Sequence, residues 1–217
     1  MRFPTLFERF STRFGGATSN PALQPERALN YDLGWSSQFA PNARVSVDLF
    51  YSFVNNLIQN VPVPAYGPNV TQSQNIGSGR FAGAEVSADY QPRDDFSLGG
   101  NLTVMRRRVY APYIPNFQPI GVPDIKLFLY AGYRPIPTVA LTPNIEMASN
   151  RWTSTPDGSL YYRTGTYFLT NFNADWQASE NIKLSAGVRN LFDQLYTLTN
   201  GFPEPGRSMY LALKATF

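Results

Sequence analysis

Apolar and polar side chains alternate along most of the chain with a period of two. Residues 44–49 show the pattern, because Val45, Val47 and Leu49 alternate with arginine, serine and aspartate. This period places alternate side chains on opposite faces of a β-strand, one apolar and one polar. Comparable segments predict strands at residues 29–35, 84–90, 96–104, 125–133, 139–147, 168–176, 182–189 and 208–217, with a partial strand at residues 2–10. The sequence therefore predicts about ten strands.

The connections between these segments alternate between short and long. Short turns are expected near residues 40–43, 91–95, 134–138 and 177–181, and long loops near residues 11–25, 61–74, 111–123, 154–165 and 198–207. Transmembrane barrels have this asymmetry, with tight turns on the periplasmic side and long loops outside. The serine, asparagine and acidic residues of the polar face suit a watery lumen and would be costly in a soluble core. We therefore predict an all-β, transmembrane, antiparallel up-and-down β-barrel wall.

Composition narrows the function further. Aromatic residues make up 15% of the chain, with 13 Tyr and 16 Phe, as aromatic girdles at two membrane interfaces would require. No apolar run approaches the roughly 18 residues of a membrane helix. The chain has no cysteine and no histidine, which excludes disulfides, thiolate and imidazole metal sites and histidine-dependent catalysis. We expect no enzyme activity, no metal site and no cofactor, and the net charge of +3 is too small to indicate a nucleic-acid partner.

Three stretches carry a family resemblance. The first is Gly187-Val-Arg-Asn-Leu-Phe-Asp193, followed by Tyr196, Pro205-Gly-Arg207 and an alternating strand that ends on Phe217. The others are Asn20-Pro-Ala-Leu-Gln-Pro-Glu26 with Asn30-Tyr-Asp-Leu-Gly34, and Asn75-Ile-Gly with Gly83-Ala-Glu85. Together they resemble the C-terminal end of TonB-dependent outer-membrane receptors. The signature residues are Asn190, Leu191, Phe192, Asp193, Tyr196, Pro205, Gly206, Arg207 and Phe217.

The resemblance implies a fold and a function. Such receptors are expected to have a 22-stranded barrel plugged by an N-terminal domain. Residues 1–217 would be the C-terminal part of that barrel, because the chain contains neither a plug nor the charged and apolar regions of a signal peptide. The implied function is TonB-dependent uptake of a scarce ligand, specifically a ferric siderophore, in the bacterial outer membrane. Partners would be outer-membrane lipid and lipopolysaccharide, the ligand, and the TonB system acting through the plug.

Basic and aromatic residues at the predicted outer ends of strands are the candidate ligand contacts. Arginine and aromatic rings can hold an anionic, aromatic ferric siderophore through charge and cation–π contact. If the alternation holds, Arg107 faces the lumen, and rim arginines can also meet lipopolysaccharide phosphates or solvent. The candidates are Arg106, Arg107, Arg108, Tyr110, Tyr113, Arg151, Trp152, Tyr161, Tyr162 and Arg163.

Four charged residues are assigned to the barrel wall rather than to the ligand. Glu85, Asp89, Asp175 and Lys183 lie on the predicted polar face and are expected to form ion pairs along it. Two other functions stay open at this point. The chain could form a small stand-alone porin-like barrel, which would conduct ions, or a soluble all-β binding module, in which residues such as Leu49 and Phe172 would pack in a core.

Overall fold

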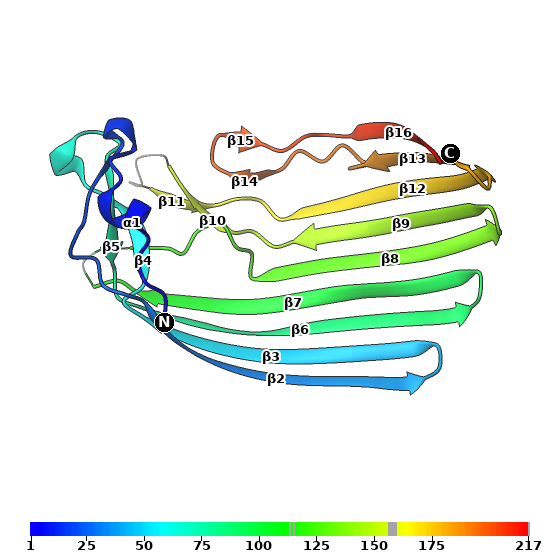
Figure 1. Ribbon diagram of the computed structural model, residues 1–217, viewed down its shortest axis with the longest axis horizontal. Coiled ribbons are helices and arrows are strands. Elements are labelled where there is room, and N and C mark those ends of the chain that lie inside the picture. The colour runs from blue at the N-terminus through cyan, green and yellow to red at the C-terminus, as the bar shows by residue number, and fades with distance from the viewer. Residues whose placement is uncertain (113, 115, 156–159, 217) are drawn as a thin grey trace.

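The computed structural model describes residues 1–112, 114, 116–155 and 160–216, which form mainly antiparallel β-structure. Nine long strands lie side by side in one sheet of order β16-β13-β12-β9-β8-β7-β6-β3-β2 (Figure 1). Each therefore pairs with its neighbours along the chain, as predicted for an up-and-down sheet. The nine are β2 (Arg27–Ala40), β3 (Ala43–Asn55), β6 (Ser78–Arg93), β7 (Phe96–Tyr110), β8 (Ile125–Ile136), β9 (Val139–Ala148), β12 (Tyr167–Ser179), β13 (Ile182–Arg189) and β16 (Ser208–Ala215).

The predicted segregation of connection lengths is confirmed. Two-residue turns at 41–42, 94–95, 137–138 and 180–181 all lie at one end of the sheet, the turn end, on the right in Figure 1. The longer connections lie at the opposite end, the loop end. These connections hold six of the short strands: β4 (Ile58–Pro62), β5 (Thr71–Asn75), β10 (Trp152–Ser154), β11 (Tyr161–Arg163), β14 (Thr197–Thr199) and β15 (Phe202–Pro203).

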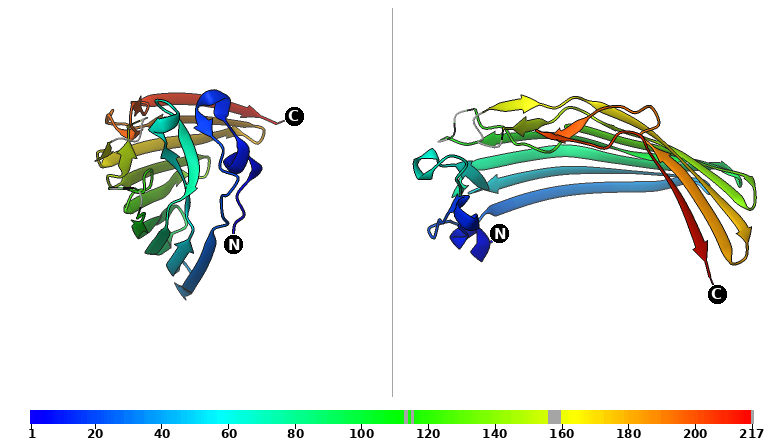
Figure 2. Two further views of the ribbon diagram at one scale, coloured as in Figure 1. Left: turned by 90° about the vertical axis from the view of Figure 1, so that its left-hand side faces the viewer. Right: turned by 90° about the horizontal axis from the view of Figure 1, so that it is seen from above.

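The large sheet is curved and open. β2 forms one edge and β16 forms the other, and these two strands are not paired with each other. Seen from the loop end, the strands follow an arc (Figure 2). Because barrel diameter grows with strand number, such an arc suits the wall of a large barrel. The nine strands thus form a barrel wall without closing into a barrel.

The strand register sorts side chains onto two faces, as the alternation predicts. Val47, Val86 and Leu102 occupy paired positions on β3, β6 and β7 and share the apolar face. One residue along, Ser46 and Ser87 share the polar face, with their hydroxyl oxygens 2.7 Å apart. Large apolar side chains on the apolar face are exposed, including Leu33, Trp35, Leu49, Leu129, Phe172, Leu211 and Leu213. The structure therefore presents an uncovered apolar surface over the strands.

Residues 2–10 do not form the predicted partial strand, and this correction accounts for the difference between ten expected and nine observed long strands. Residues Leu6–Phe10 form helix α1. The Thr5 hydroxyl accepts a hydrogen bond from the Glu8 amide at 3.1 Å, and the Glu8 carboxylate accepts one from the Thr5 amide at 2.7 Å. This capping box satisfies the first amides of the helix. The local capping contacts outweigh the weak alternation of the segment.

The N-terminal segment is fastened to the loop end. The backbones of Arg2 and Glu26 are joined by two hydrogen bonds of 2.9 Å, and the Arg2 guanidinium lies 2.8 Å from the Glu8 carboxylate. Burial raises the pKa of Glu8, but hydrogen bonds from Thr5 and Arg2 outweigh it and hold that pKa below its ordinary value. The carboxylate therefore stays charged and keeps the segment in place.

Residues 11–25, predicted as a loop, carry two short elements, η1 (Arg13–Gly15) and β1 (Ala17–Thr18). β1 pairs with β5, which pairs with β4, and η2 (Pro64–Tyr66) joins β4 to β5. Leu23, which follows β1 in the chain, is fully buried. No helix among the described residues has the length and apolar character needed to cross a membrane.

Candidate ligand-binding site

Arg107 lies at the loop end of β7 and belongs to the polar face, where its paired residue is Phe81. Its Nη2 donates a hydrogen bond to the carbonyl oxygen of Val122. Its Nε is buried and has no hydrogen-bond partner within the described part of the chain. A buried polar group without a hydrogen-bond partner lowers the stability of the folded state by about 1–3 kcal/mol. The Arg107 guanidinium can therefore donate a further hydrogen bond to a ligand oxygen.

The segment at residues 121–122 links Arg107 to Arg151. Gly121 has a φ of 85°, a left-handed conformation that favours glycine. Its amide donates to the Trp152 carbonyl at 2.9 Å, and its own carbonyl accepts from Arg151 Nη1 at 3.4 Å. Arg107 and Arg151 thus hold two consecutive carbonyl groups, and we call these two arginines with residues 121–122 the two-arginine cluster.

The two-arginine cluster carries two positive charges. Neither Arg107 nor Arg151 forms an ion pair with a described carboxylate. The charges of Asp124 and Arg151 act on Arg107, and Glu146 and Arg151 both act on the Tyr167 hydroxyl, so two acids lie near the cluster without forming an ion pair with it. Such a cluster attracts anions, because the local charge is only partly neutralised.

Aromatic rings hold the neighbouring guanidinium groups. Arg163 pairs with Trp152 across the β10–β11 hairpin, and its guanidinium carbon lies 4.9 Å from the Trp152 ring centroid. Arg163 Nη1 also donates to Asn150 Oδ1 at 2.8 Å. The Arg151 guanidinium lies 5.7 Å from the ring of Tyr167. These cation–π contacts orient the arginine side chains and leave their positive charge without a neutralising carboxylate.

The loop between β7 and β8 thus links Arg107 and Arg151, two candidate residues that lie far apart in the sequence. The ring of Tyr161 on β11 lies 6.1 Å from Phe117 in this loop, and burial raises the pKa of the Tyr161 hydroxyl. Tyr162 pairs with Thr153 and is 38% exposed. Tyr113 lies outside the described residues.

Three candidates lie on the other side of the sheet. Arg106, Arg108 and Tyr110 share the apolar face with Val104, because they follow it at two-residue intervals on β7. They are exposed, and the sheet separates them from Arg107. The alternation that turns Arg107 inward therefore removes these three from the two-arginine cluster.

The sequence did not predict that the signature residue Tyr196 and two acids would lie together beside the cluster. Glu146, Tyr196 and Glu204 line a cavity of about 350 Å³ on the polar face. Tyr167 donates a hydrogen bond to Glu146 at 3.0 Å and packs 4.6 Å from the ring of Tyr196. Burial, with the charges of Glu204 and Glu146, raises the pKa of Tyr196. The polar-face position of Glu146 between Ile145 and Met147 was the available signal.

The signature residues have a structural role. Asn190 exchanges hydrogen bonds of 2.9 Å with the backbone of Gln194, and Asp193 Oδ1 accepts one of 2.6 Å from the Arg207 amide. Asn190 and Asp193 have φ values of 51° and 55°. A Cβ on Gly206 would lie 2.5 Å from Asp193 Oδ1, so a larger residue there would displace the carboxylate that holds the Arg207 amide. These contacts close the connection between β13 and β16.

The rest of the signature surrounds this closure. Tyr196 O accepts a hydrogen bond of 3.0 Å from the Glu204 amide, and the Leu191 carbonyl accepts a longer one from Arg207. Pro205 lines the cavity near Glu146, and Phe192 is exposed. Phe217 lies outside the described residues.

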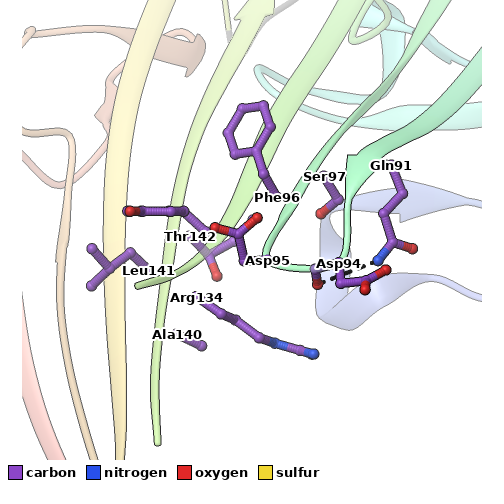
Figure 3. A pocket seen from close by; sticks show the side chains of 11 residues that line it. Gln91, Asp94, Asp95, Phe96, Ser97, Arg134, Ala140, Leu141 and Thr142 are labelled. Atoms are coloured by element: carbon purple, nitrogen blue, oxygen red, sulfur yellow. Dashed lines mark hydrogen bonds between the residues drawn. The ribbon is translucent and has the colours of Figure 1, made fainter. Parts of the chain in front are cut away.

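A second cavity, of about 280 Å³, lies at the turn end (Figure 3). Asp94, Asp95 and Arg134 come from the two-residue turns and strand ends around it. Gln91 donates a long hydrogen bond of 3.5 Å to the Asp94 carbonyl. It contains none of the candidate residues, so we do not assign the ligand to it.

Acids and hydroxyls on the polar face make wall contacts. Lys183 lies 3.3 Å from Asp175, whose carboxylate also accepts a hydrogen bond from Ser185. Tyr130 donates to Asp89 at 2.6 Å. The predicted ion pairs of Glu85 and Asp89 do not form among the described residues, and Glu85 faces Asp48 and Thr103 in the register. The polar face is therefore a hydrogen-bonded surface beside the candidate site.

Comparison with known proteins identifies the family to which this sheet belongs. Residues 1–191 match the family model "TonB dependent receptor-like, beta-barrel". The chain belongs to the TonB-dependent receptor β-barrel family. Barrels of this family are outer-membrane proteins of Gram-negative bacteria. Membership favours the receptor interpretation over the porin-like and soluble alternatives.

Solved structures show the same fold. The copper transporter OprC aligns with a TM-score of 0.80 at 21% identity, covering 100% of this chain and 36% of that one. The ferric enterobactin receptor PfeA of Pseudomonas aeruginosa, crystallised with enterobactin, gives 0.75 at 19%, covering 93% and 33%. The siderophore receptor PirA of P. aeruginosa gives 0.70 at 21%, covering 99% and 34%. The chain thus spans about a third of these proteins.

The family fixes the orientation of the sheet. In outer-membrane barrels the short turns are periplasmic and the long loops extracellular, so the turn end faces the periplasm and the loop end faces outward. In such barrels the outward face is apolar and the lumenal face is polar, so the polar face of this sheet corresponds to the lumenal side. The two-arginine cluster therefore lies on the lumenal side near the extracellular opening.

Proposed function

We propose that this chain forms part of the wall of a receptor for TonB-dependent uptake of an anionic ferric siderophore. The observation that carries the proposal is the two-arginine cluster on the lumenal face. Arg107 and Arg151 are joined through residues 121–122, have no carboxylate ion pair among the described residues, and leave a buried Nε unpartnered.

The chemistry of the cluster suits such a ligand. Arginine binds carboxylate and phenolate oxygens with charge-assisted hydrogen bonds, and it cannot lose its proton at physiological pH. Trp152, Tyr161 and Tyr167 offer aromatic surface beside the cations. Charge and ring stacking together fit an anionic complex with aromatic groups. PirA is named a siderophore receptor and PfeA a ferric enterobactin receptor, which supports this class.

A copper ligand is the second candidate, because OprC is named a copper transporter. Soft thioether, thiolate and imidazole ligands favour copper. This chain has no cysteine, no histidine and four methionines. Of the methionines in the large sheet, Met147 and Met209 share the apolar face with Phe168 and Val188, and Met105 alone is on the lumenal face. The lumenal wall therefore favours an anion over a soft metal ion.

The remaining parts of the proposal concern partners. We propose that the nine strands are the C-terminal part of a larger barrel whose plug contacts TonB, which the two open edges of the sheet support. We also propose that the apolar face contacts outer-membrane lipid and that its extracellular rim meets lipopolysaccharide. We assign no covalent chemistry to this wall.

Uptake of ⁵⁵Fe tests the proposal. Cells producing the full-length receptor would be given ⁵⁵Fe bound to catecholate, hydroxamate or carboxylate siderophores, with and without a functional TonB system. We expect TonB-dependent uptake of one class, and loss of most of it in the Arg107→Gln/Arg151→Gln variant. Equal uptake in receptor-deficient cells, or uptake without TonB, would contradict the proposal.

A further inference from the structure

Two arginines face each other on the lipid-facing surface near the extracellular end. Arg80 on β6 is paired with Arg108 on β7. Residues at such positions have Cβ atoms about 4.5–5.5 Å apart, and like charges placed this way are destabilising. Arg106 lies on the same face, diagonal to Arg80 and about 7–8 Å away. We call Arg80, Arg106 and Arg108 the rim arginine patch.

No acid compensates the patch on the part of this surface that the structure describes. Among the described residues, none of the three arginines forms an ion pair. The register gives their surroundings on the same face: Arg27, Leu29, Tyr31, Tyr51, Phe53, Asn55, Ser78, Ala82, Val104 and Tyr110. This set contains a fourth arginine and no carboxylate. The counter-charge must therefore come from outside the described strands.

The patch borders a preformed hollow. A cavity of about 280 Å³ is lined by Ser78, Arg80, Arg108, Val109 and Tyr110. All but Val109 belong to two cross-strand pairs of the lipid-facing surface. The Arg80 guanidinium lies 5.8 Å from the Phe53 ring centroid, which restrains it beside the hollow. The hydroxyl groups of Ser78 and Tyr110 add hydrogen-bond donors.

Aromatic residues mark the depth of the patch in the membrane. Tyr31 and Tyr51, with ring centroids 6.5 Å apart, lie in the same row as Arg106. At the turn end, Phe96 packs 6.4 Å from Tyr133. The ten positions from Phe96 to Arg106 span about 33 Å along the strand. A strand tilt of roughly 40° reduces this to about 25 Å, the height of the apolar band between aromatic girdles. The patch therefore lies at headgroup level.

We propose that the rim arginine patch binds a phosphate group of lipopolysaccharide, the phosphorylated glycolipid of the outer leaflet. The inference gives residues and geometry to the lipopolysaccharide contact proposed above. A phosphate neutralises the opposed arginines and accepts hydrogen bonds from both, a pairing that guanidinium geometry favours. Lipid attachment explains why these cations lie on the lipid side of the wall and not in the lumen.

Native mass spectrometry of the full-length receptor in detergent tests this binding. The probes are lipid A carrying its phosphates, dephosphorylated lipid A, phosphatidylglycerol and inorganic phosphate. We expect the wild-type receptor to bind phosphorylated lipid A in preference to the other three. Arg80→Gln/Arg108→Gln should lower that binding about tenfold, through the loss of charge-assisted hydrogen bonds. Arg80→Lys/Arg108→Lys should keep more of it.

Arg134→Gln is the matched control, because Arg134 is an exposed arginine at the periplasmic end without an ion pair among the described residues. It should bind phosphorylated lipid A as the wild type does. Equal binding of dephosphorylated lipid A, phosphatidylglycerol or inorganic phosphate would overturn the proposal, as would undiminished binding by the double glutamine variant. The wild-type comparison decides the matter even if that variant does not assemble. Because ⁵⁵Fe uptake is a separate readout, failure of this site and failure of the uptake proposal are distinguishable.

Discussion

Arg107 and Arg108 are adjacent in the sequence and have opposite surroundings. Arg107 is partly buried on the lumenal face, where it donates a hydrogen bond to the Val122 carbonyl and lies close to Arg151. Arg108 is exposed on the apolar face, opposite Arg80 and beside a hollow of its own. A strand turns each successive side chain to the other face, so one position decides between ligand and lipid. The run of three arginines therefore serves two surfaces.

The largest expected effect comes from placing a charge on the wrong face. Leu102→Arg puts a cation near the middle of the lipid-facing band and should destabilise the folded receptor by about 2–4 kcal/mol. Asn101→Arg changes the adjacent residue, which faces the lumen, and should cost far less. Urea unfolding of the receptor in lipid vesicles measures both. Equal costs would mean that the faces are not divided as the register shows.

Removing the lumenal cations should have the next largest effect. Arg107→Gln/Arg151→Gln loses two charge-assisted contacts to an anionic ligand, so uptake of the recognised ferric siderophore should fall about 10- to 100-fold. The loss should appear mainly as a higher apparent KM for ⁵⁵Fe uptake. Arg134→Gln, which changes an arginine outside the cluster, is the control. Unchanged uptake in the double variant would exclude the cluster from ligand binding.

A smaller effect is expected where the signature closes the last connection. Asp193→Ala removes the acceptor of the Arg207 amide and should lower the free energy of unfolding by about 1–2 kcal/mol. Asp193→Asn keeps an acceptor and tolerates the positive φ, so it should lose less. Urea unfolding compares the two variants. An alanine variant as stable as wild type would refute the structural role of the signature.

The smallest effect concerns pH at the N-terminal segment. The pKa of Glu8 is lowered in the folded state, so its contribution is present above the ordinary carboxyl pKa and is lost as pH falls through the lowered value. We expect the free energy of protection against amide hydrogen exchange in residues 2–10 to fall at that acidic pH, by less than about 1 kcal/mol. Glu8→Gln should remove this pH dependence. Identical pH profiles for both proteins would exclude Glu8 as the titrating group.

The alternation and turn signals predicted most of the fold. Each predicted strand from residue 29 onward corresponds to a long strand, because the period of two follows directly from a sheet with one apolar face and one polar face. Residues 2–10 were wrongly predicted, since a capping box between Thr5 and Glu8 depends on two specific contacts and not on periodicity. The loop elements β4, β5, β10 and β11 also lacked a periodic signal, because each is at most five residues long.

The candidate site was only partly predictable. The lumenal direction of Arg107 followed from strand parity. The same parity places Arg106 and Arg108 on the other face, although both were predicted from the sequence as ligand contacts. The link from Arg107 to Arg151 depends on where an irregular loop places Gly121 and Val122. The cavity around Glu146 and Tyr196 combines residues fifty positions apart, which local pattern cannot bring together.

The division of β7 between lumen and lipid can be measured directly. The chain contains no cysteine, so spin labels can be placed one at a time at positions 99–108 through cysteine substitutions. Collision with oxygen, which concentrates in lipid, and with a water-soluble nickel chelate then reports the side on which each label lies. We predict oxygen maxima at even positions and nickel maxima at odd positions, with label 107 on the aqueous side. A profile without this period, or with label 107 on the lipid side, would contradict the account.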